Sequence, residues 1–284
     1  MALRPRLLVS LSLIGLMFFA ATRIQAAGPK IYVVTDLEGA SGVYCWAQCR
    51  GAEAKKTPLG QKAMEYFMGD LAAVVRGLRD GGAGEILVLD GHGAQAIVPH
   101  LMEPGAKYIT GLARPKLFEG LDETFAGVVQ MAAHSMMGTP DGLLNHTQDS
   151  ILENRYWYNG LESGELAQVA IYAAHFNVPT IMVSGDEATC RESRKFFGDS
   201  CVTVAVKRGL AREAAVLYPF AETRRALYEG AKRAVDAIPL CDPYKIKMPI
   251  QIKTQRLTFD GPDKKPRVVT KEGTIPDGLH IYNF

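Results

Sequence analysis

Short apolar runs rich in β-branched residues alternate along this chain with longer stretches in which apolar residues recur at helical spacing. Residues 31–35 and 85–90 predict two buried strands, and residues 61–79 between them predict an amphipathic helix that ends at a pair of glycines. This strand–helix–strand order predicts parallel strands joined by a crossover. We therefore expect an α/β fold with a mostly parallel sheet flanked by helices.

The same pattern continues to Pro239 and then changes. Further strands are predicted at residues 108–112, 127–133, 179–186 and 201–206, and further helices at 163–176 (N-cap Ser163), 212–217 and 222–238. After Pro239 the apolar residues fall in short extended pieces broken by glycine and proline. Residues 240–284 are therefore expected to form a small extended C-terminal segment, either as an antiparallel layer or as an oligomer contact.

The first residues have a different character from the rest of the chain. Two arginines precede a mostly apolar run, residues 7–21, which is short for a membrane span, and Ala26 places a small residue at a cleavage point. We expect residues 1–26 to be a cleaved signal peptide and the mature protein to be periplasmic or secreted. An uncleaved anchor is the alternative. The α/β domain would then occupy residues 27–239.

Net charge and cysteine content limit the binding partners and the disulfides that the chain can have. Residues 1–26 contain three arginines and no acidic residue, so their removal changes the formal net charge from +2 to −1. A nearly neutral chain offers no electrostatic attraction for nucleic acid or an anionic membrane.

The five cysteines allow two disulfides between residues close in sequence if the protein reaches an oxidising compartment. These are Cys45 with Cys49, and Cys190 with Cys201, which leave Cys241 unpaired. The spacing leaves the connectivity open.

Polar side chains follow several of the predicted strands at the point where each strand ends. Asp36 and Glu38 follow the first strand, His92 follows residues 85–90, His134 follows residues 127–133, and Glu165 lies at a helix start. Parallel strands place their carboxyl ends at one edge of a sheet, where ligands bind. Carboxylate and imidazole ligands suit zinc, and also manganese or cobalt. Five ligands exceed the three of a single catalytic zinc and predict two divalent metal ions, with Asp36 as the bridge.

Several of these residues also have a plainer interpretation when taken singly. His134 suits a hydrogen-bonded core histidine, and Glu165 suits an acid that complements a helix dipole. Asp90 and Asp186 also end strands, and we expect them to orient loops or other ligands.

A set of ordered motifs between residues 31 and 238 resembles the zinc D-aminopeptidases of the DppA type. The motifs are Asp36-Leu-Glu38-Gly-Ala-Ser-Gly42, Asp90-Gly-His92-Gly93, His134-Ser-Met-Met-Gly138-Thr, Leu144-Asn-His146-Thr, Gly164-Glu165 and Val183-Ser-Gly185-Asp186. The resemblance implies an α/β fold, two zinc ions on Asp36, Glu38, His92, His134 and Glu165, and His146 as the catalytic residue. It also implies a decamer of stacked pentamer rings that removes N-terminal D-residues from short peptides such as D-Ala-D-Ala.

Two features depart from this family pattern. The export signal is unlike the cytoplasmic character of the best-known relatives, and no family motif is matched after Pro239. A metal-dependent amidase or L-aminopeptidase is an alternative function, and so is a non-catalytic periplasmic protein that binds metal or peptide. If the chain is an enzyme, His146 is expected on an exposed loop, where it donates a hydrogen bond or a proton to the oxyanion or to the leaving amine.

Overall fold

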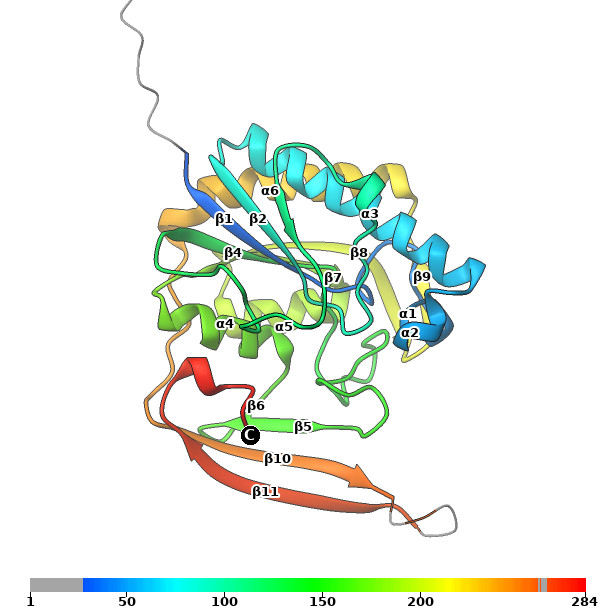
Figure 1. The fold of residues 1–284 in the computed structure, drawn as a ribbon, viewed down its shortest axis with the longest axis vertical. Coiled ribbons are helices and arrows are strands. Elements are labelled where there is room, and N and C mark those ends of the chain that lie inside the picture. The colour runs from blue at the N-terminus through cyan, green and yellow to red at the C-terminus, as the bar shows by residue number, and fades with distance from the viewer. Residues whose placement is uncertain (1–27, 260, 262–264) are drawn as a thin grey trace, which may run out of the picture.

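The computed structural model describes residues 28–259, 261 and 265–284, and it contains two sheets (Figure 1). The larger sheet has the strand order β3-β2-β1-β4-β7-β8-β9, and neighbouring strands are parallel except for β9. Its strands are β1 (Lys30–Thr35), β2 (Glu85–Asp90), β3 (Lys107–Ile109), β4 (Phe125–Met131), β7 (Thr180–Asp186), β8 (Val202–Ala211) and β9 (Ala214–Leu217). The α/β prediction is confirmed. The predicted signal peptide, residues 1–26, lies outside the described residues.

Helices cover both faces of this sheet. One face carries α3 (Pro58–Asp80) and α6 (Phe220–Ala237), and the other carries α4 (Glu165–His175) and α5 (Glu187–Phe197) (Figure 1). The α3 and α6 backbones approach so closely at Gly77 that a Cβ atom there would meet the Tyr228 carbonyl oxygen at 2.2 Å. Short helices α1 (Trp46–Cys49) and α2 (Gly51–Ala54) follow β1, and η1 (Pro99–Leu101), η2 (Ile238–Leu240) and η3 (Gly278–His280) are 3-10 turns. Within the described ranges, no helix combines the length and apolar character needed to cross a bilayer.

The smaller sheet is antiparallel and brings the C-terminal segment against the middle of the chain. Its order is β11-β10-β5-β6, with β5 (Arg155–Tyr158), β6 (Leu161–Ser163), β10 (Ile250–Thr258) and β11 (Arg267–Ile275). Strand β10 pairs with β5, so that Ile252 lies opposite Tyr158. A second apolar core, which includes Tyr32, Ile171 and Ile250, fills the space between the large sheet and this layer. The C-terminal segment therefore forms an antiparallel layer, one of its two expected arrangements.

The sequence predictions for three local elements were wrong. Residues 212–217 were predicted to be helical, but they form a turn and β9, which pairs with the edge of the large sheet. Helix α5 was not predicted; Asp186 caps it by accepting a hydrogen bond from the Thr189 N–H. The N-cap of α4 is Gly164 rather than Ser163, whose hydroxyl donates instead to the Leu161 carbonyl.

All five cysteines lie in the described part of the chain, and each is a free thiol. The Cys201 sulfur contacts the Ser193 hydroxyl at 3.7 Å rather than Cys190. Burial raises the pKa of both Cys190 and Cys201 to about 12, so these thiols are protonated at neutral pH. Neither local disulfide option is formed in the structure.

Candidate metal centre

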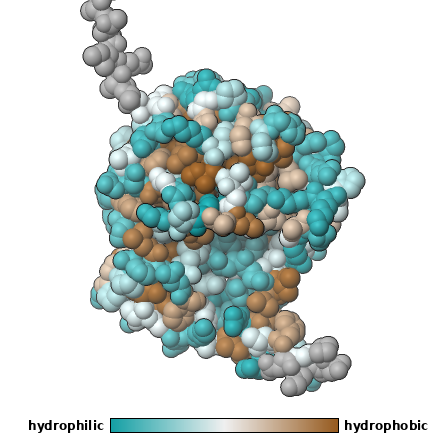
Figure 2. Space-filling model, viewed as in Figure 1, coloured by the Kyte–Doolittle hydropathy of each residue, from teal (hydrophilic) through white to brown (hydrophobic). Residues whose placement is uncertain are grey.

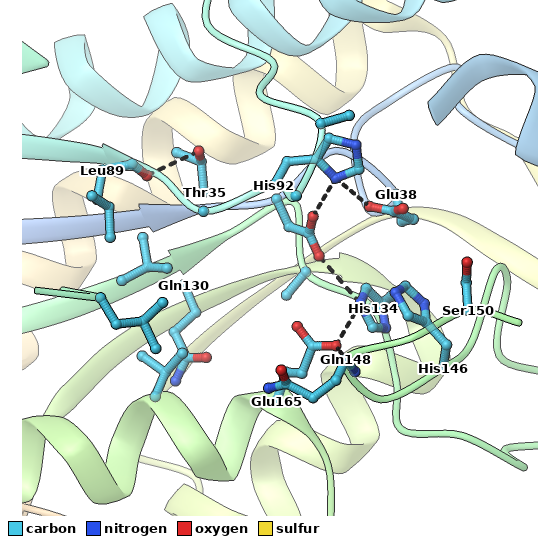
Figure 3. A pocket seen from close by; sticks show the side chains of 18 of the residues that line it. Thr35, Glu38, Leu89, His92, Gln130, His134, His146, Gln148, Ser150 and Glu165 are labelled. Atoms are coloured by element: carbon cyan, nitrogen blue, oxygen red, sulfur yellow. Dashed lines mark hydrogen bonds and ion pairs between the residues drawn. The ribbon is translucent and has the colours of Figure 1, made fainter. Parts of the chain in front are cut away.

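The side chains predicted to bind metal converge at the carboxyl edge of the large sheet (Figure 3). Asp36 and Glu38 come directly after β1, His92 follows β2, His134 follows β4, and Glu165 is the first residue of α4. These strands are neighbours in the sheet, so their ends meet at one place. Asp36 lies just beyond β1, where its backbone N–H still donates to the Met131 carbonyl of β4.

Asp36, Glu38 and His92 form the first of two clusters suited to hold a metal ion. His92 Nδ1 lies 3.0 Å from Asp36 Oδ1 and 3.2 Å from Glu38 Oε2. Its other nitrogen, Nε2, donates to the Cys49 carbonyl at 2.9 Å, which fixes the orientation of the ring. Such an outer contact leaves Nδ1 directed at the carboxylates and is typical of a metal-binding histidine.

His134, His146 and Glu165 form the second cluster. The two imidazole rings stack with their centroids 3.8 Å apart. Each ring donates through Nδ1 to a backbone carbonyl, His134 to Ser135 at 3.0 Å and His146 to Leu144 at 2.9 Å. His134 Nε2 lies 3.6 Å from Glu165 Oε1. Both rings therefore keep Nε2 for a ligand or a proton.

The Asp36 carboxylate lies between the two clusters. Its Oδ1 contacts His92 of the first cluster, and its Oδ2 lies 3.2 Å from His134 Nε2 of the second. One carboxylate oxygen thus faces each group of ligands, which is the geometry expected of a bridging residue.

The electrostatics of the site favour positive charge next to these carboxylates. Burial works to raise the pKa of Asp36, but the close imidazoles of His134 and His92 outweigh it and hold that pKa well below its usual value. Burial works to lower the pKa of His134, but the carboxylates of Glu165 and Asp36 raise it to about 10. The pKa of His92 is raised well above its usual value by Glu38 and Asp36, against the same opposing effect of burial. The carboxylates therefore need a proton or a metal ion between them and the imidazoles.

Two buried atoms in the clusters complete no hydrogen bond, namely Glu38 Oε2 and His134 Nε2. An unpaired buried polar atom costs free energy unless another group satisfies it. Both atoms face the neighbouring ligands, and a donor set of imidazoles and carboxylates is one that zinc accepts. The residues present therefore fit a divalent metal centre.

His146 was expected on an exposed loop, but its side chain is only 7 % exposed. It stacks on His134, and the edge of the Trp46 ring lies against it with centroids 5.5 Å apart. Burial, and then the neighbouring His134, lower the pKa of His146. The loop is buried because the Arg212 carbonyl accepts a hydrogen bond from the Leu144 N–H, so long-range contacts rather than the loop sequence position this ring.

Two positioning residues were missed in the sequence. The Lys207 ammonium is buried beneath the segment after β1 and donates to the carbonyls of Glu38, Ala40 and Val43 at 2.6, 2.7 and 2.6 Å. The Gln148 backbone N–H donates to Glu165 Oε1 at 2.6 Å. Nothing in the pattern around either residue distinguishes it, because both contacts depend on segments that are distant in sequence.

The expectation for Asp90 and Asp186 agrees with their contacts. The Asp90 carboxylate accepts from the backbone N–H groups of Ala96 and Ile97, and so closes the loop that carries His92. The Asp186 carboxylate accepts from the Leu143 N–H in the loop before His146, in addition to capping α5. Both aspartates therefore orient loops.

A cavity of about 520 Å³ opens directly onto the two clusters. Its walls combine the candidate ligands with apolar side chains and two arginines. The apolar lining residues include Val34, Leu89, Phe118, Val169 and Tyr282, and the two arginines are Arg50 and Arg114. Figure 2 shows the apolar side chains, in brown, among the hydrophilic ones on the face seen in Figure 1.

Comparisons with known proteins identify the family to which the chain belongs. The sequence model of the peptidase M55 family, described as D-aminopeptidase, matches residues 30–264. The chain is 29 % identical over 207 residues to the D-aminopeptidase of Bacillus subtilis (strain 168). This alignment covers 70 % of this chain and 71 % of that protein. Its fold is similar to that of the Zn-dependent D-aminopeptidase DppA from Bacillus subtilis, described as a self-compartmentalizing protease, with a TM-score of 0.79 and 23 % identity over 89 % of this chain and 94 % of the other. We conclude that the chain belongs to the peptidase M55 family of D-aminopeptidases and is a metallo-aminopeptidase.

Proposed function

We propose that this chain is an exported dinuclear zinc aminopeptidase that releases N-terminal D-residues from short peptides such as D-Ala-D-Ala. The observation that carries the proposal is the pair of facing clusters with Asp36 between them. Asp36, Glu38 and His92 would hold one ion, and His134 and Glu165 the other, with Asp36 shared. The similarity in fold to a Zn-dependent D-aminopeptidase supports zinc as the metal.

The chemistry follows from what the side chains can hold and move. When bound, divalent ions supply an activated water and polarise the scissile carbonyl. The carboxylates of Asp36 and Glu165 line the cavity and can accept hydrogen bonds from the free α-amino group of a peptide. Partial burial of these carboxylates strengthens such charged contacts.

His146 is the proposed catalytic residue. Its Nδ1–H donates to the Leu144 carbonyl, so Nε2 carries the lone pair. Because its pKa is lowered, the ring is neutral at pH 7 and can take a proton at Nε2 from the attacking water. The protonated ring can then deliver that proton to the leaving amine.

Two arginines of the cavity favour a short substrate with a free carboxylate. Arg114 donates through Nη1 to the carbonyls of Asp90 and Gly111, and Arg50 lies over the Trp46 ring, 4.0 Å from its centroid. Neither guanidinium has an acidic partner in the part of the chain that the structure describes. A dipeptide or tripeptide whose amine reaches the carboxylates can offer its own C-terminal carboxylate to such a cation.

The sequence of residues 1–26 supports an exported protein, and the fold comparison supports an oligomeric one. Residues 1–26 have the basic and apolar pattern of a signal peptide, which supports a periplasmic or secreted protein. The similarity to a self-compartmentalizing protease supports a homo-oligomer, with the decamer as the proposed state. Analytical ultracentrifugation of the mature protein tests this state, and a monomer would contradict it.

A peptide panel tests the activity itself. Purified protein would be assayed on D-Ala-D-Ala, L-Ala-L-Ala and N-acetyl-D-Ala-D-Ala, before and after removal of metal by a chelator, and again after addition of zinc. We expect turnover of the free D-peptide alone, its loss with the chelator and its return with zinc. Glu38→Gln should behave like the chelated protein, whereas Glu222→Gln, an exposed change on α6, should behave like wild type.

Each other outcome identifies a different function. Preference for the L-peptide would indicate an L-aminopeptidase, and equal turnover of the acetylated peptide would indicate an amidase. Tight metal binding with no turnover would indicate a binding protein.

A further inference from the structure

The C-terminal segment contributes a side chain to the cavity of the metal centre. Tyr282, two residues before the C-terminal Phe284, lines the same cavity as Asp36 and Glu165. The family match ends at residue 264, so this contribution comes from a part of the chain that the match does not cover.

Several contacts hold Tyr282 in this position. The turn η3 lies against α4 so closely that a Cβ atom at Gly278 would meet the Ile171 carbonyl oxygen at 2.3 Å. Ile281, next to the tyrosine, is buried in the core between the sheets. The Asp277 carboxylate caps the turn by accepting from the Leu279 N–H at 2.9 Å. Because α4 begins with Glu165, docking of the tail on this helix places Tyr282 in a fixed relation to the metal centre.

The tyrosine ring completes an apolar wall. Its centroid lies 5.7 Å from that of Phe118, which packs in turn on Tyr172 of α4 at 4.6 Å. Val34, Leu89 and Val169 line the same cavity. Apolar side chains that face a cavity beside charged groups form a surface suited to an apolar substituent of a ligand.

A second set of contacts engages the tyrosine hydroxyl. The Gln148 side chain lies near the Tyr282 hydroxyl, and the Gln148 backbone N–H donates to Glu165 Oε1. The Gln148 side-chain amide donates to Gln168 Oε1 at 2.6 Å, and Gln168 donates to the Tyr158 hydroxyl at 2.8 Å. The Gln148 side chain near the hydroxyl and the Phe118 ring beside the tyrosine ring together restrain Tyr282.

From this arrangement we propose that Tyr282 is a specificity-determining residue, whose ring closes the subsite for an apolar peptide side chain and limits it to small groups such as methyl. The inference rests on the proposed function for the identity of the ligand as a peptide. An amine held at the carboxylates leaves the neighbouring side chain of the same residue to face this wall. A methyl group fits against the ring, whereas a larger side chain needs the space that the ring occupies.

The test compares two substitutions at this position with one elsewhere in the tail. Tyr282→Ala removes the ring, and Tyr282→Phe keeps the ring and removes the hydroxyl. Tyr244→Ala is the matched control, because Tyr244 belongs to the same C-terminal segment but packs against Phe196 and Phe197, 6.3 and 6.1 Å away, and does not line the cavity. Zinc content of each variant would be checked by elemental analysis.

The first readout is the ratio of kcat/KM for D-Leu-D-Ala to that for D-Ala-D-Ala. Tyr282→Ala should raise this ratio by about tenfold or more, since changes in apolar pocket contacts alter discrimination on this order. Tyr282→Phe and Tyr244→Ala should keep the wild-type ratio. The second readout is calorimetric affinity for free D-leucine relative to free D-alanine, which should shift in the same direction without any turnover.

The possible results separate the two proposals. If Tyr282→Ala changes kcat/KM for both peptides by one common factor, and the affinities for both free amino acids likewise, the tyrosine only stabilises the fold. The inference is then overturned. If Tyr244→Ala shifts the ratio as strongly, the effect comes from the tail as a whole and the inference is also overturned. If wild type cleaves no D-peptide, the proposed function fails, and the calorimetric comparison still decides the role of Tyr282.

Discussion

Replacement of Lys207 by methionine removes the buried cation that holds the segment carrying Asp36 and Glu38. The lysine side chain is 0 % exposed, and its ammonium donates to the three carbonyls of Glu38, Ala40 and Val43. Methionine has a similar length and fills most of the space. The substitution therefore tests the hydrogen bonds and the charge with little change in packing.

The size of the effect follows from two opposing contributions. Each hydrogen bond to a charged group contributes about 1.5 to 3 kcal/mol, so the three together contribute about 5 to 9 kcal/mol. Burial lowers the pKa of Lys207 from 10.5 to about 8, which at pH 7 corresponds to a cost of about 3 kcal/mol for the charged form. Lys207→Met should therefore lower the free energy of unfolding by about 2 to 6 kcal/mol.

The assay is denaturant unfolding at pH 7, with and without zinc. Lys232→Met, an exposed change on α6, is the control and should unfold like wild type. In the presence of a chelator, Lys207→Met should lower the free energy of unfolding by about 2 to 6 kcal/mol, the hydrogen-bond contribution less the cost of burying the charge. With zinc the loss should grow, because a displaced segment weakens metal binding, and metal bound only to the folded state adds stability. If the free energy of unfolding of Lys207→Met lies within about 0.5 kcal/mol of the wild-type value and the zinc content is unchanged, the Lys207 hydrogen bonds do not hold this segment in place.

Four further outcomes are expected. Asp36→Ala should lose both metal ions, measured by elemental analysis, because its two oxygens face both clusters; unchanged metal content would contradict the bridge. His146→Ala should keep its zinc and lose roughly a hundredfold to ten-thousandfold in kcat, and loss of metal instead would make His146 a ligand. Burial raises the pKa of Glu192 from 4.5 to about 7, so its contribution to stability is full below pH 4.5 and is lost as the pH rises through 7. Glu192→Gln should match wild type near pH 4 and exceed it by as much as about 3 kcal/mol above pH 8 in unfolding experiments, and a constant difference would refute this. N-terminal sequencing of exported protein should begin near Ala27, and an intact Met1 would contradict cleavage.

Local pattern determined much of the fold and the approximate place of the site. The apolar runs that end at Thr35, Asp90 and Met131 are strands in the structure because each is short, β-branched and bounded by turn residues. Neighbouring parallel strands end at the same edge, so the residues after them must lie near one another. The convergence of Asp36 and His92 could therefore be predicted without coordinates.

Helical propensity alone misassigned the residues around β9. The stretch Ala214–Leu217 contains good helix formers, but β8 presents an unpaired edge, and hydrogen bonds to that edge outweigh local preference. The sequence contains no local signal of this competition, because it depends on where β8 ends relative to its neighbours.

Only the tertiary structure decided the environment of the remaining site residues. His146 is buried because it stacks on His134, and Lys207 reaches carbonyls more than 160 residues away along the chain. Tyr282 enters the cavity because the tail docks on α4. The Lys207 and Tyr282 contacts join segments far apart in sequence, and the energy of each contact depends on the positions of both segments. Periodicity in one segment determines which face of that segment is buried, but not which distant side chain packs against it.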